Sequence, residues 1–555
     1  MSVVREQILL NKINKLKSCI YSSSIEMDNW ETRLGIFKAA GNYEITNEQW
    51  GNITVGTRWE AKDDLVRWFR RSITIPEKLK GKKVVLDIEV GGEGLVYVNG
   101  EIKSAITSYL TPWAATRTRV LLTSNAKGNE TVDVLIEAGL NYMEFAKYRS
   151  KGMESVQYEF RSAKLCEVDT KVEKYYFDAI VTYEVMQILA GKTPNRIPKN
   201  IEEMVASFVK FDKYGTIIHD KLVEALESSL LALDFDFSRE RLLSSIDEAE
   251  NILEEKLNTI PHLPQGQIVL TGHSHIDTAW LWPIKETIKK CSRTFSNTVA
   301  LLEEFPEHNF AQSQPQLYEY TKKYYPELYE KIKEKVKEGR WELIGNSWVE
   351  CDTNVPSGES LVRQILYGRN FFKDEFGKWS DIFWMPDVFG YSWALPQIIK
   401  RSGMEYFYTA KLNNNDVNRF PYSLFWWQGI DGTKIISYLQ RATYNGEINP
   451  SFINELWTNY DEKELHNEVL GTYGFGDGGG GPTYEMLEYS KRLKNFPGMP
   501  TAKLDSAQAF FERVKLNSGN LPLWNDEMYY EFHRGTYTSQ ANTKKNNRKS
   551  ELLYR

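Results

Sequence analysis

Residues 267–283 read QIVLTGHSHIDTAWLWP, and this stretch decides how the second half of the chain is interpreted. Its first six residues form a short apolar run rich in β-branched side chains, which is typical of a buried strand. Residues 285–305 follow with the apolar spacing of a helix. We therefore expect a strand followed by a crossover helix, the repeating unit of a parallel sheet.

The same alternation continues downstream. Strand-like runs at 341–345, 381–386, 406–411 and 434–440 alternate with helical segments at 329–339 and 394–403. This order is typical of either a closed barrel or an open α/β sheet. We predict an α/β multidomain protein in which residues 263–525 form a (β/α) barrel catalytic domain with parallel strands.

The first 170 residues have a different residue pattern, typical of β-strands. Runs at 67–76, 82–90, 93–101 and 130–139 are rich in β-branched and aromatic residues and are separated by turn residues, and Asn99-Gly100 is a hairpin signal. Leu9, Ile13, Leu16 and Ile20 have helical spacing. The predicted domain at 1–170 is therefore an N-terminal helix followed by a β-sandwich.

Two further domains complete the predicted organisation. Apolar residues recur with helical periodicity in 171–191, 201–214 and 241–260, so we predict a helical connector at 171–262, which Pro261 and Pro264 end. The charged run at the end of the chain is expected to begin a downstream helical domain at 526–555, truncated at the last residue.

Composition excludes several classes of protein. The chain has 555 residues, is 41% hydrophobic and 26% charged, and has a net charge of -6, which argues against disorder and against nucleic acid or an anionic membrane recognised by bulk charge. Four distant cysteines indicate no disulfide or zinc-finger framework. The N-terminus is a poor signal peptide and no run spans a membrane, so a cytoplasmic location is expected. The 16 Trp, 31 Tyr and 26 Phe suit a carbohydrate protein, although large aromatic cores explain most of them.

Chemically useful side chains follow the predicted strands. Barrel and open-sheet enzymes build their active sites from such residues, because the carboxyl ends of parallel strands meet at one edge. One polar residue there means little, whereas a series in register is a stronger signal. The series comprises His273, His275, Asp277, Asn346, Trp348, Glu350, Asp352, Asp387, Lys411 and Asp477.

The segment HSHID predicts a metal site. Residues two apart in an extended chain face the same side, so His273, His275 and Asp277 can act together, and imidazole and carboxylate groups bind Zn²⁺. The alternative is a histidine that caps a helix or bonds a neighbouring loop. Amidohydrolase barrels share the His-x-His pattern, but they need more histidines, and only His308, His466 and His533 remain downstream.

Asp387 and Asp477 are candidates for paired carboxylates. Asp387 follows Pro386 in FWMPDVFGYS, where it is either a helix cap or a carboxylate presented at a strand end. Asp477 lies in GFGDGGGGPT, which lacks the Gly-Lys-Ser/Thr of a phosphate loop and is either a flexible turn or a mobile loop carrying Asp477. Together they could serve glycoside hydrolysis.

Residues 531–548 form a last candidate segment. It contains His533, Arg534, Tyr537 and Thr538, and it is either a solvated basic loop or a substrate contact. His533 is also a metal ligand by residue type.

Four ordered motifs, GHSHIDTAWLWP, FWMPDVFGYS, GFGDGGGGPT and EFHRGTYTSQAN, together resemble the class II α-mannosidases of glycoside hydrolase family 38, most closely the cytosolic-type branch. The resemblance implies a zinc-dependent retaining exo-α-mannosidase acting on α-mannoside oligosaccharides, with one Zn²⁺ per chain or another divalent ion such as Co²⁺. His275, Asp277 and Asp387 would be metal ligands, Asp387 the nucleophile and Asp477 the acid/base.

The resemblance also implies substrate contacts, and the chain differs from the family's pattern in one respect. Trp280, Trp282, His533, Arg534 and Tyr537 are candidate sugar contacts, with barrel packing as the alternative for the two tryptophans. The family's last zinc ligand lies in a later His-Asp segment that this chain does not reach, so three protein ligands are expected. The rival functions are a metal-dependent amidohydrolase or deacetylase and a non-catalytic carbohydrate-binding fragment. No nucleic-acid or membrane partner is expected, and a homo-oligomer is left open.

Overall fold

Strands with alternating polar and apolar residues build an antiparallel sandwich in the first 170 residues of the protein. The computed structural model describes residues 3–46, 49–108, 116–191, 216–235, 238–262, 264 and 266–554. Within the sandwich, one face of each strand packs on a shared core, as the alternation in Thr131–Gly139 illustrates. This agrees with the predicted sandwich, since period-two alternation buries one face of a strand.

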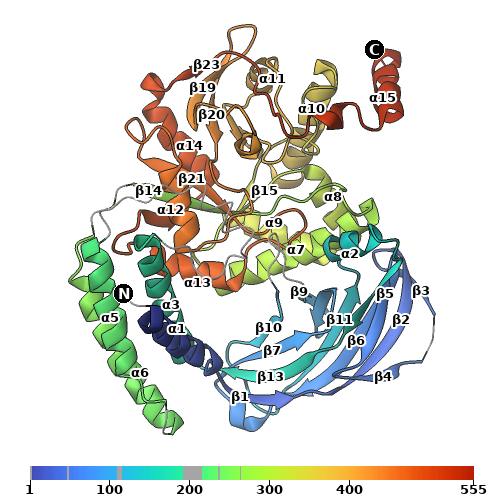
Figure 1. Cartoon of the computed structure of the whole chain (residues 1–555). Helices are drawn as coiled ribbons and strands as arrows, with labels where there is room; N and C mark the ends of the chain where they lie inside the picture. The colour runs from blue at the N-terminus through green and yellow to red at the C-terminus, as the bar shows by residue number, and fades with distance from the viewer. Residues whose placement is uncertain are drawn as a thin grey trace.

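The sandwich consists of two sheets and a short pair, seen at the lower right of Figure 1. The four-stranded sheet has the order β1 (Tyr21–Glu26), β13 (Ser162–Val168), β7 (Lys83–Glu89) and β10 (Arg119–Thr123). The seven-stranded sheet contains β3 (Asn42–Ile45), β2 (Asn29–Ala39), β6 (Leu65–Thr74), β11 (Thr131–Gly139), β8 (Glu93–Val98), β9 (Glu101–Thr107) and, paired with β2, β4 (Gly51–Thr54). The pair is β12 (Ser155–Glu159) with β5 (Arg58–Lys62), and α2 (Tyr142–Arg149) precedes β12.

The predicted hairpin at Asn99-Gly100 is present. It joins β8 to β9, and both residues have positive φ, 53° and 84°. Two consecutive left-handed residues fit the twist of a two-residue hairpin, which is why Asn-Gly is favoured there.

Helices lie beside the sandwich at the lower left of Figure 1. Leu9, Ile13 and Leu16 are buried on the N-terminal helix, as their spacing predicts, and they join one core with the helices that follow. The helix expected at 201–214 lies outside the described residues. The helices are α1 (Val3–Ser18), α3 (Thr170–Leu189), α5 (Thr216–Leu231) and α6 (Arg239–Asn258).

Parallel strands organise the second half. Strand β14 (Gln267–His273), the run QIVLTGH, pairs in parallel with three neighbours because it is apolar on both faces and buried throughout. Its sheet contains β16 (Trp341–Leu343), β15 (Phe310–Gln312), β14, β21 (Glu468–Tyr473) and β22 (Thr501–Leu504). The second sheet has the order β17 (Ile382–Trp384), β18 (Tyr406–Thr409), β20 (Lys434–Leu439), β19 (Leu424–Gln428) and β23 (Leu523–Trp524).

Helices follow most of these strands, as expected for crossover connections. One of them, α7, follows β14 and packs against β9 and β8 of the sandwich, so it joins the two halves of the molecule. The helices are α7 (Ile284–Glu304), α8 (Pro315–Tyr324), α9 (Pro326–Lys337), α10 (Gly358–Phe376), α11 (Leu395–Arg401), α12 (Pro450–Thr458), α13 (Tyr484–Leu493), α14 (Ala507–Leu516) and α15 (Ala541–Leu553).

Parallel pairing is therefore present, but among the described residues the strands form two separate sheets. The structure thus supports mixed α/β architecture and does not by itself establish the closed barrel. Strand β19 is antiparallel to β20, which the simple β-then-α alternation did not predict.

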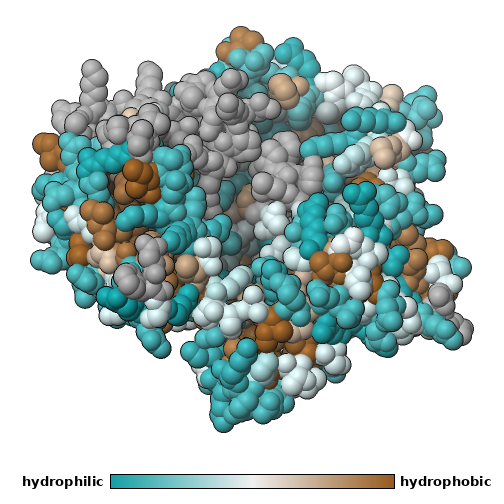
Figure 2. Space-filling model, turned by 60° about the horizontal axis from the view of Figure 1, so that its bottom comes forward, coloured by the Kyte–Doolittle hydropathy of each residue, from teal (hydrophilic) through white to brown (hydrophobic). Residues whose placement is uncertain are grey.

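The surface is predominantly hydrophilic on the face shown in Figure 2, where apolar residues form separate groups. Such scattered groups are ordinary for a protein surface. Among the described residues, none of the helices combines the length and the hydropathy needed to cross a bilayer.

Candidate active site

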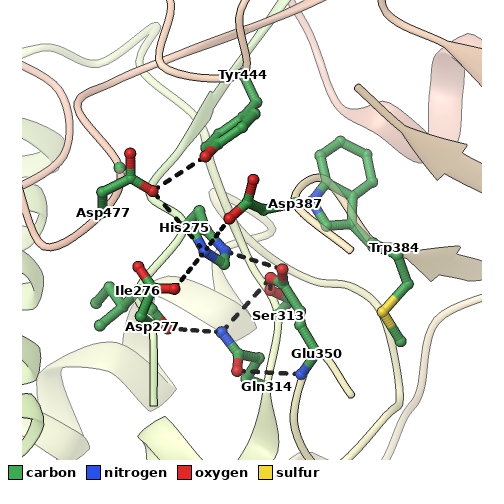
Figure 3. A network of polar contacts seen from close by, with 12 residues as sticks. His275, Ile276, Asp277, Ser313, Gln314, Glu350, Trp384, Asp387, Tyr444 and Asp477 are labelled. Atoms are coloured by element: carbon green, nitrogen blue, oxygen red, sulfur yellow. Dashed lines mark hydrogen bonds and ion pairs between the residues drawn. The ribbon is translucent and has the colours of Figure 1, made fainter. Parts of the chain in front are cut away.

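Loops at the carboxyl ends of the parallel strands bring the predicted residues together (Figure 3). His275 and Asp277 follow β14, Glu350 follows β16, Asp387 follows β17, and Asp477 follows β21. Ion-pair distances of 3.9 Å or less join His275 to each of the other four. The strand-end series therefore converges on one buried imidazole.

The geometry around His275 has two sides. Its Nε2 lies 3.5 Å from Asp277 Oδ1 and 3.5 Å from Asp387 Oδ2, while its Nδ1 lies 2.8 Å from Glu350 Oε2. Ligand atoms of His275, Asp277 and Asp387 all lie within 4.8 Å of one another. Nε2 thus faces the carboxylates of Asp277 and Asp387, whereas Nδ1 faces the carboxylate of Glu350.

Those three residues fit a divalent metal ion. Two ligands that each lie about 2.1 Å from a tetrahedral Zn²⁺ are about 3.4 Å apart, close to the two distances of 3.5 Å observed. Asp277 Oδ2 is buried and has no hydrogen-bond partner within the described residues. Glu350 behind the imidazole is the outer carboxylate that metal-binding histidines usually have.

The electrostatics of the pocket favour positive charge. Burial would lower the pKa of His275, but Glu350 and Asp277 outweigh it and raise this pKa well above its ordinary value. Ser313 Oγ donates to Glu350 Oε1 at 2.9 Å, and the backbone nitrogen of Glu350 donates to Gln314 at 3.1 Å. Glu350 is therefore fixed in place by the loop after β15.

Asp477 lies on the same side of His275 as Asp277 and Asp387, with its Oδ1 3.9 Å from Nε2. Its carboxylate accepts hydrogen bonds from Tyr444 Oη at 3.1 Å and Asn445 Nδ2 at 2.9 Å. Burial raises the pKa of Asp477 to about 7, Asp277 and Asp387 add to the increase, and His275 opposes it. Asp477 therefore holds a proton more readily than an exposed aspartate does.

Tyr444 and Lys411 extend the cluster. Burial, followed by the charges of Asp477 and Asp387, raises the pKa of Tyr444 well above its ordinary value, so its hydroxyl remains a donor. The Lys411 ammonium contacts Asp387 Oδ1, leaving Oδ2 toward His275. Tyr444 was not singled out from the sequence, although it follows β20 and the strand-end rule would have found it.

The remaining histidines do not enlarge the cluster. His273, expected on the same face as His275, instead packs behind the site, where its Nδ1 lies 2.8 Å from the Ala311 carbonyl and burial lowers its pKa to about 3. His308 contacts Tyr473, and His466 packs on the Phe510 ring. The described residues therefore offer no second set of histidines of the kind a two-metal amidohydrolase needs.

The two tryptophans predicted as sugar contacts differ in how exposed their side chains are. Trp280 is 52% exposed, whereas Trp282 is 3% exposed and packs with the sandwich core. The structure therefore favours the packing alternative for Trp282, one face of which lies 4.6 Å from the Lys290 ammonium. Trp280 retains an open face.

The segment containing His533 packs near the site. The His533 ring lies against Phe389, with centroids 4.6 Å apart, and Tyr537 bonds the Phe389 carbonyl. Arg534 Nε donates to the carbonyl of Glu531. In the part of the chain that the structure describes, the group of residues that could hold a metal ion comprises His275, Asp277 and Asp387 and does not include His533.

The glycine run is held by hydrogen bonds. Phe475 and Gly481 exchange two backbone hydrogen bonds at 3.0 and 2.8 Å, and Gly479 donates to the Gly476 carbonyl at 2.8 Å. Asp477 has a φ of 52°, which is uncommon for a residue with a side chain. The structure thus favours a tightly fixed turn over a loose one.

Known proteins match both halves of the chain. Residues 265–527 match the Glycosyl hydrolases family 38 N-terminal domain, and residues 24–166 match the Alpha-mannosidase, jelly roll domain. The chain is 34% identical over 540 residues to Alpha-mannosidase G of Dictyostelium discoideum, covering 97% of this chain and 45% of that protein. It is 34% identical over 489 residues to Alpha-mannosidase 2C1 of Homo sapiens, covering 88% and 44% respectively.

A third relative is Alpha-mannosidase of Saccharomyces cerevisiae, 42% identical over 292 residues, covering 51% of this chain and 27% of that protein. The chain thus spans about half the length of the first curated relatives that it matches. The resemblance seen in the four motifs is confirmed, and the sandwich is of the jelly-roll type. The chain belongs to glycoside hydrolase family 38, the class II α-mannosidases.

Proposed function

We propose that the chain carries the active site of a zinc-dependent retaining exo-α-mannosidase that releases mannose from α-mannosides and manno-oligosaccharides. One observation carries the proposal. Asp387 and Asp477 both approach Nε2 of the His275 imidazole, at 3.5 and 3.9 Å, the Tyr444 hydroxyl donates to Asp477, and the charges of both carboxylates raise the pKa of Tyr444. Two carboxyl groups around one small pocket are what glycoside hydrolysis requires.

The first displacement uses both carboxyl groups. Asp387 attacks the anomeric carbon and forms a covalent bond to mannose, while the glycosidic carbon–oxygen bond breaks. Asp477 donates its proton to the departing oxygen. Tyr444 and Asn445 hold the Asp477 carboxyl in place during this transfer.

The second displacement reverses these roles. Asp477, now ionised, takes a proton from water, and the water oxygen attacks the anomeric carbon as its bond to Asp387 breaks. Mannose leaves with retained configuration, and Asp477 recovers its proton. Lys411 pairs with Asp387 and so orients the carboxylate for both steps.

His275, Asp277 and Asp387 are the residues that would hold the metal ion, with Glu350 fixing the imidazole. When bound there, Zn²⁺ would supply positive charge that polarises hydroxyl groups of the sugar. We propose Trp280, His533, Arg534 and Tyr537 as further contacts to the oligosaccharide, because Trp280 is exposed, His533 and Tyr537 contact Phe389, two residues after Asp387, and Arg534 follows His533 in the chain.

We also infer that the two sheets act as one (β/α) barrel around this pocket. The backbone nitrogen of Gly345, after β16, donates to the Ile382 carbonyl of β17 at 3.0 Å. On the other side, Tyr438 of β20 donates to the Leu470 carbonyl of β21 at 2.7 Å. These contacts support a ring whose domain limits would be 263–525.

The proposal is tested with an aryl α-mannoside, an aryl acetate and a 5-fluoro mannosyl reagent. We expect mannoside turnover, no acetate turnover and covalent labelling of Asp387. Labelling of Asp477 instead would reverse the two carboxyl roles, and acetate turnover alone would favour the amidohydrolase.

Metal content gives a separate test. We expect stoichiometric zinc in the parent and none in His275→Ala, since the imidazole is the central ligand. His308→Ala is the matched control, because His308 is equally buried but lies with Tyr473. Equal zinc in the parent and in His275→Ala would place the site elsewhere.

A further inference from the structure

Positive side chains from outside the parallel sheets hold the carbonyls of the glycine run. Arg117 Nη1 donates to the Gly479 carbonyl at 2.6 Å, and Arg117 Nη2 donates to the Gly481 carbonyl at 2.6 Å. Lys290 Nζ donates to the Gly478 carbonyl at 3.3 Å. The segment directly after Asp477 is therefore bound by charge-assisted hydrogen bonds, which are stronger than neutral ones.

Both cations are tied to the jelly-roll sandwich. The backbone of Arg117 forms two hydrogen bonds with Thr107, the last residue of β9, at 2.8 and 2.9 Å. Lys290 belongs to α7, and its ammonium lies 3.4 Å from Glu93 of β8. The sandwich is thus connected to the loop that follows Asp477 through two side chains, Arg117 and Lys290.

The glycines are needed because the cations come so close. A Cβ at Gly480 would lie 2.6 Å from Arg117 Nη1, and a Cβ at Gly478 would lie 2.5 Å from Lys290 Cδ. Both glycines also have positive φ, 93° and 73°. The run at 478–481 therefore needs glycine to leave room for these two side chains. A residue with a Cβ would also be strained at a positive φ.

Asp477 lies directly before the glycines that Arg117 and Lys290 bind, and its backbone is in a left-handed conformation with φ of 52°. Such a backbone persists only where its surroundings fix it. Tyr444 and Asn445 fix the carboxylate, whereas Arg117 and Lys290 fix the backbone that follows. Burial lowers the pKa of Arg117 to about 10, so it remains charged at neutral pH.

We propose that Arg117 and Lys290 are positioning residues for the acid/base step, through which the jelly-roll sandwich sets the place of the Asp477 carboxyl. This inference rests on the proposed role of Asp477. Without Arg117, three carbonyl contacts are lost and the loop gains conformations in which the carboxyl is too far from the leaving oxygen. Proton donation suffers, but attack by Asp387 does not.

Leaving groups distinguish these two steps. A 2,4-dinitrophenyl group departs without a proton, whereas a phenyl group needs one. We expect Arg117→Met to lower kcat/KM for phenyl α-mannoside by about 10–100-fold, part of what a general acid supplies, and to leave the dinitrophenyl substrate within about threefold. Arg117→Lys should recover part of the loss, because it restores one cationic donor.

The matched control is Arg161→Met. Arg161 belongs to the same sandwich and pairs with Glu89 on the surface, without touching the glycine run. It should leave both substrates unchanged. Equal losses on both substrates in Arg117→Met, or no loss on either, would overturn the proposal.

Hydrogen exchange supplies a readout that does not need activity. We expect faster exchange in the peptide covering 474–483 of Arg117→Met, with unchanged exchange in β14 and β21. If the parent hydrolyses no mannoside, the proposed function fails, while exchange still decides whether Arg117 holds the loop. If Arg117→Met does not fold, Lys290→Met is measured in the same way, and unchanged exchange there would contradict the inference.

Discussion

Two clusters of buried charge lie on either side of the glycine run and differ in their balance. At the interface between the jelly-roll sandwich and α7, Glu93 and Glu286 meet Lys290 and Arg293, with Arg293 2.6 Å from Glu93. Lys289 also pairs with Glu286 at 3.2 Å, and Glu137 interacts with the charges of Lys289 and Arg293, so three carboxylates face three cations. In the candidate active site, four carboxylates face one imidazole and one lysine.

The difference indicates what each cluster is for. A balanced buried network satisfies its own charges and contributes to a fixed interface. An excess of buried carboxylate is costly unless a cation or a proton compensates it. We therefore read the interface cluster as structural, and the site cluster as built for a metal ion and proton transfer.

The largest expected effect comes from breaking the site cluster at its proposed nucleophile. Asp387→Asn should lower kcat on aryl α-mannoside by at least about 10⁴-fold, because the amide cannot form the covalent bond. Its unfolding temperature should change little. Asp431→Asn, in an exposed turn, is the control and should retain full activity. Near-normal turnover by Asp387→Asn would reject the assigned nucleophile.

Breaking the interface cluster should affect stability instead. Arg293→Met leaves Glu93 and Glu286 buried without their main partner, so we expect a loss of about 3–5 kcal/mol in the free energy of unfolding. Zinc content of the folded protein should match that of the parent. Thermal or denaturant unfolding with metal analysis checks both. Loss of zinc without loss of stability would contradict the contrast between the clusters.

Glu350 tests how the site cluster orients its imidazole. Glu350→Gln keeps the shape but removes the charge 2.8 Å from His275 Nδ1, so zinc affinity should fall by about 10–100-fold. Competition with a chelator measures this change. Glu342→Gln is the matched control, since Glu342 is also buried but binds the amides at the start of α14. Unchanged zinc affinity in Glu350→Gln would remove Glu350 from the metal site.

The two tryptophans test the same contrast between activity and stability. The change in activity that we expect from them is the smallest of the series. Trp280→Ala should raise KM by about 2–12-fold and leave stability unchanged, because Trp280 is half exposed and is proposed to contact the sugar. Trp282→Ala should destabilise the fold by about 3–5 kcal/mol, because Trp282 is packed against Lys290 and the sandwich core. Steady-state kinetics and thermal unfolding of both variants decide this, and a reversed pattern would exchange their roles.

Much of the architecture could be predicted from the sequence. The runs of β-branched and aromatic residues between turn residues and the Asn99-Gly100 pair predicted the sandwich and its hairpin, because strand propensity and left-handed turns are local properties. The apolar run at 267–272 and the helix after it predicted parallel pairing. Antiparallel β19 was missed, since its direction is set by its neighbour β20.

The sequence by itself determined which residue types are available at the strand ends: His275, Asp277, Asp387 and Asp477 follow apolar runs whose carboxyl ends converge. Only the tertiary structure decided how they are used. It turned His273 away, buried Trp282, placed Glu350 against the His275 imidazole and added Tyr444 to the cluster.

It also brought Arg117 onto a loop more than 350 residues away in sequence, at Gly479 and Gly481. The physical reason is that distances and charge balance arise from packing between elements, and local sequence patterns do not contain them.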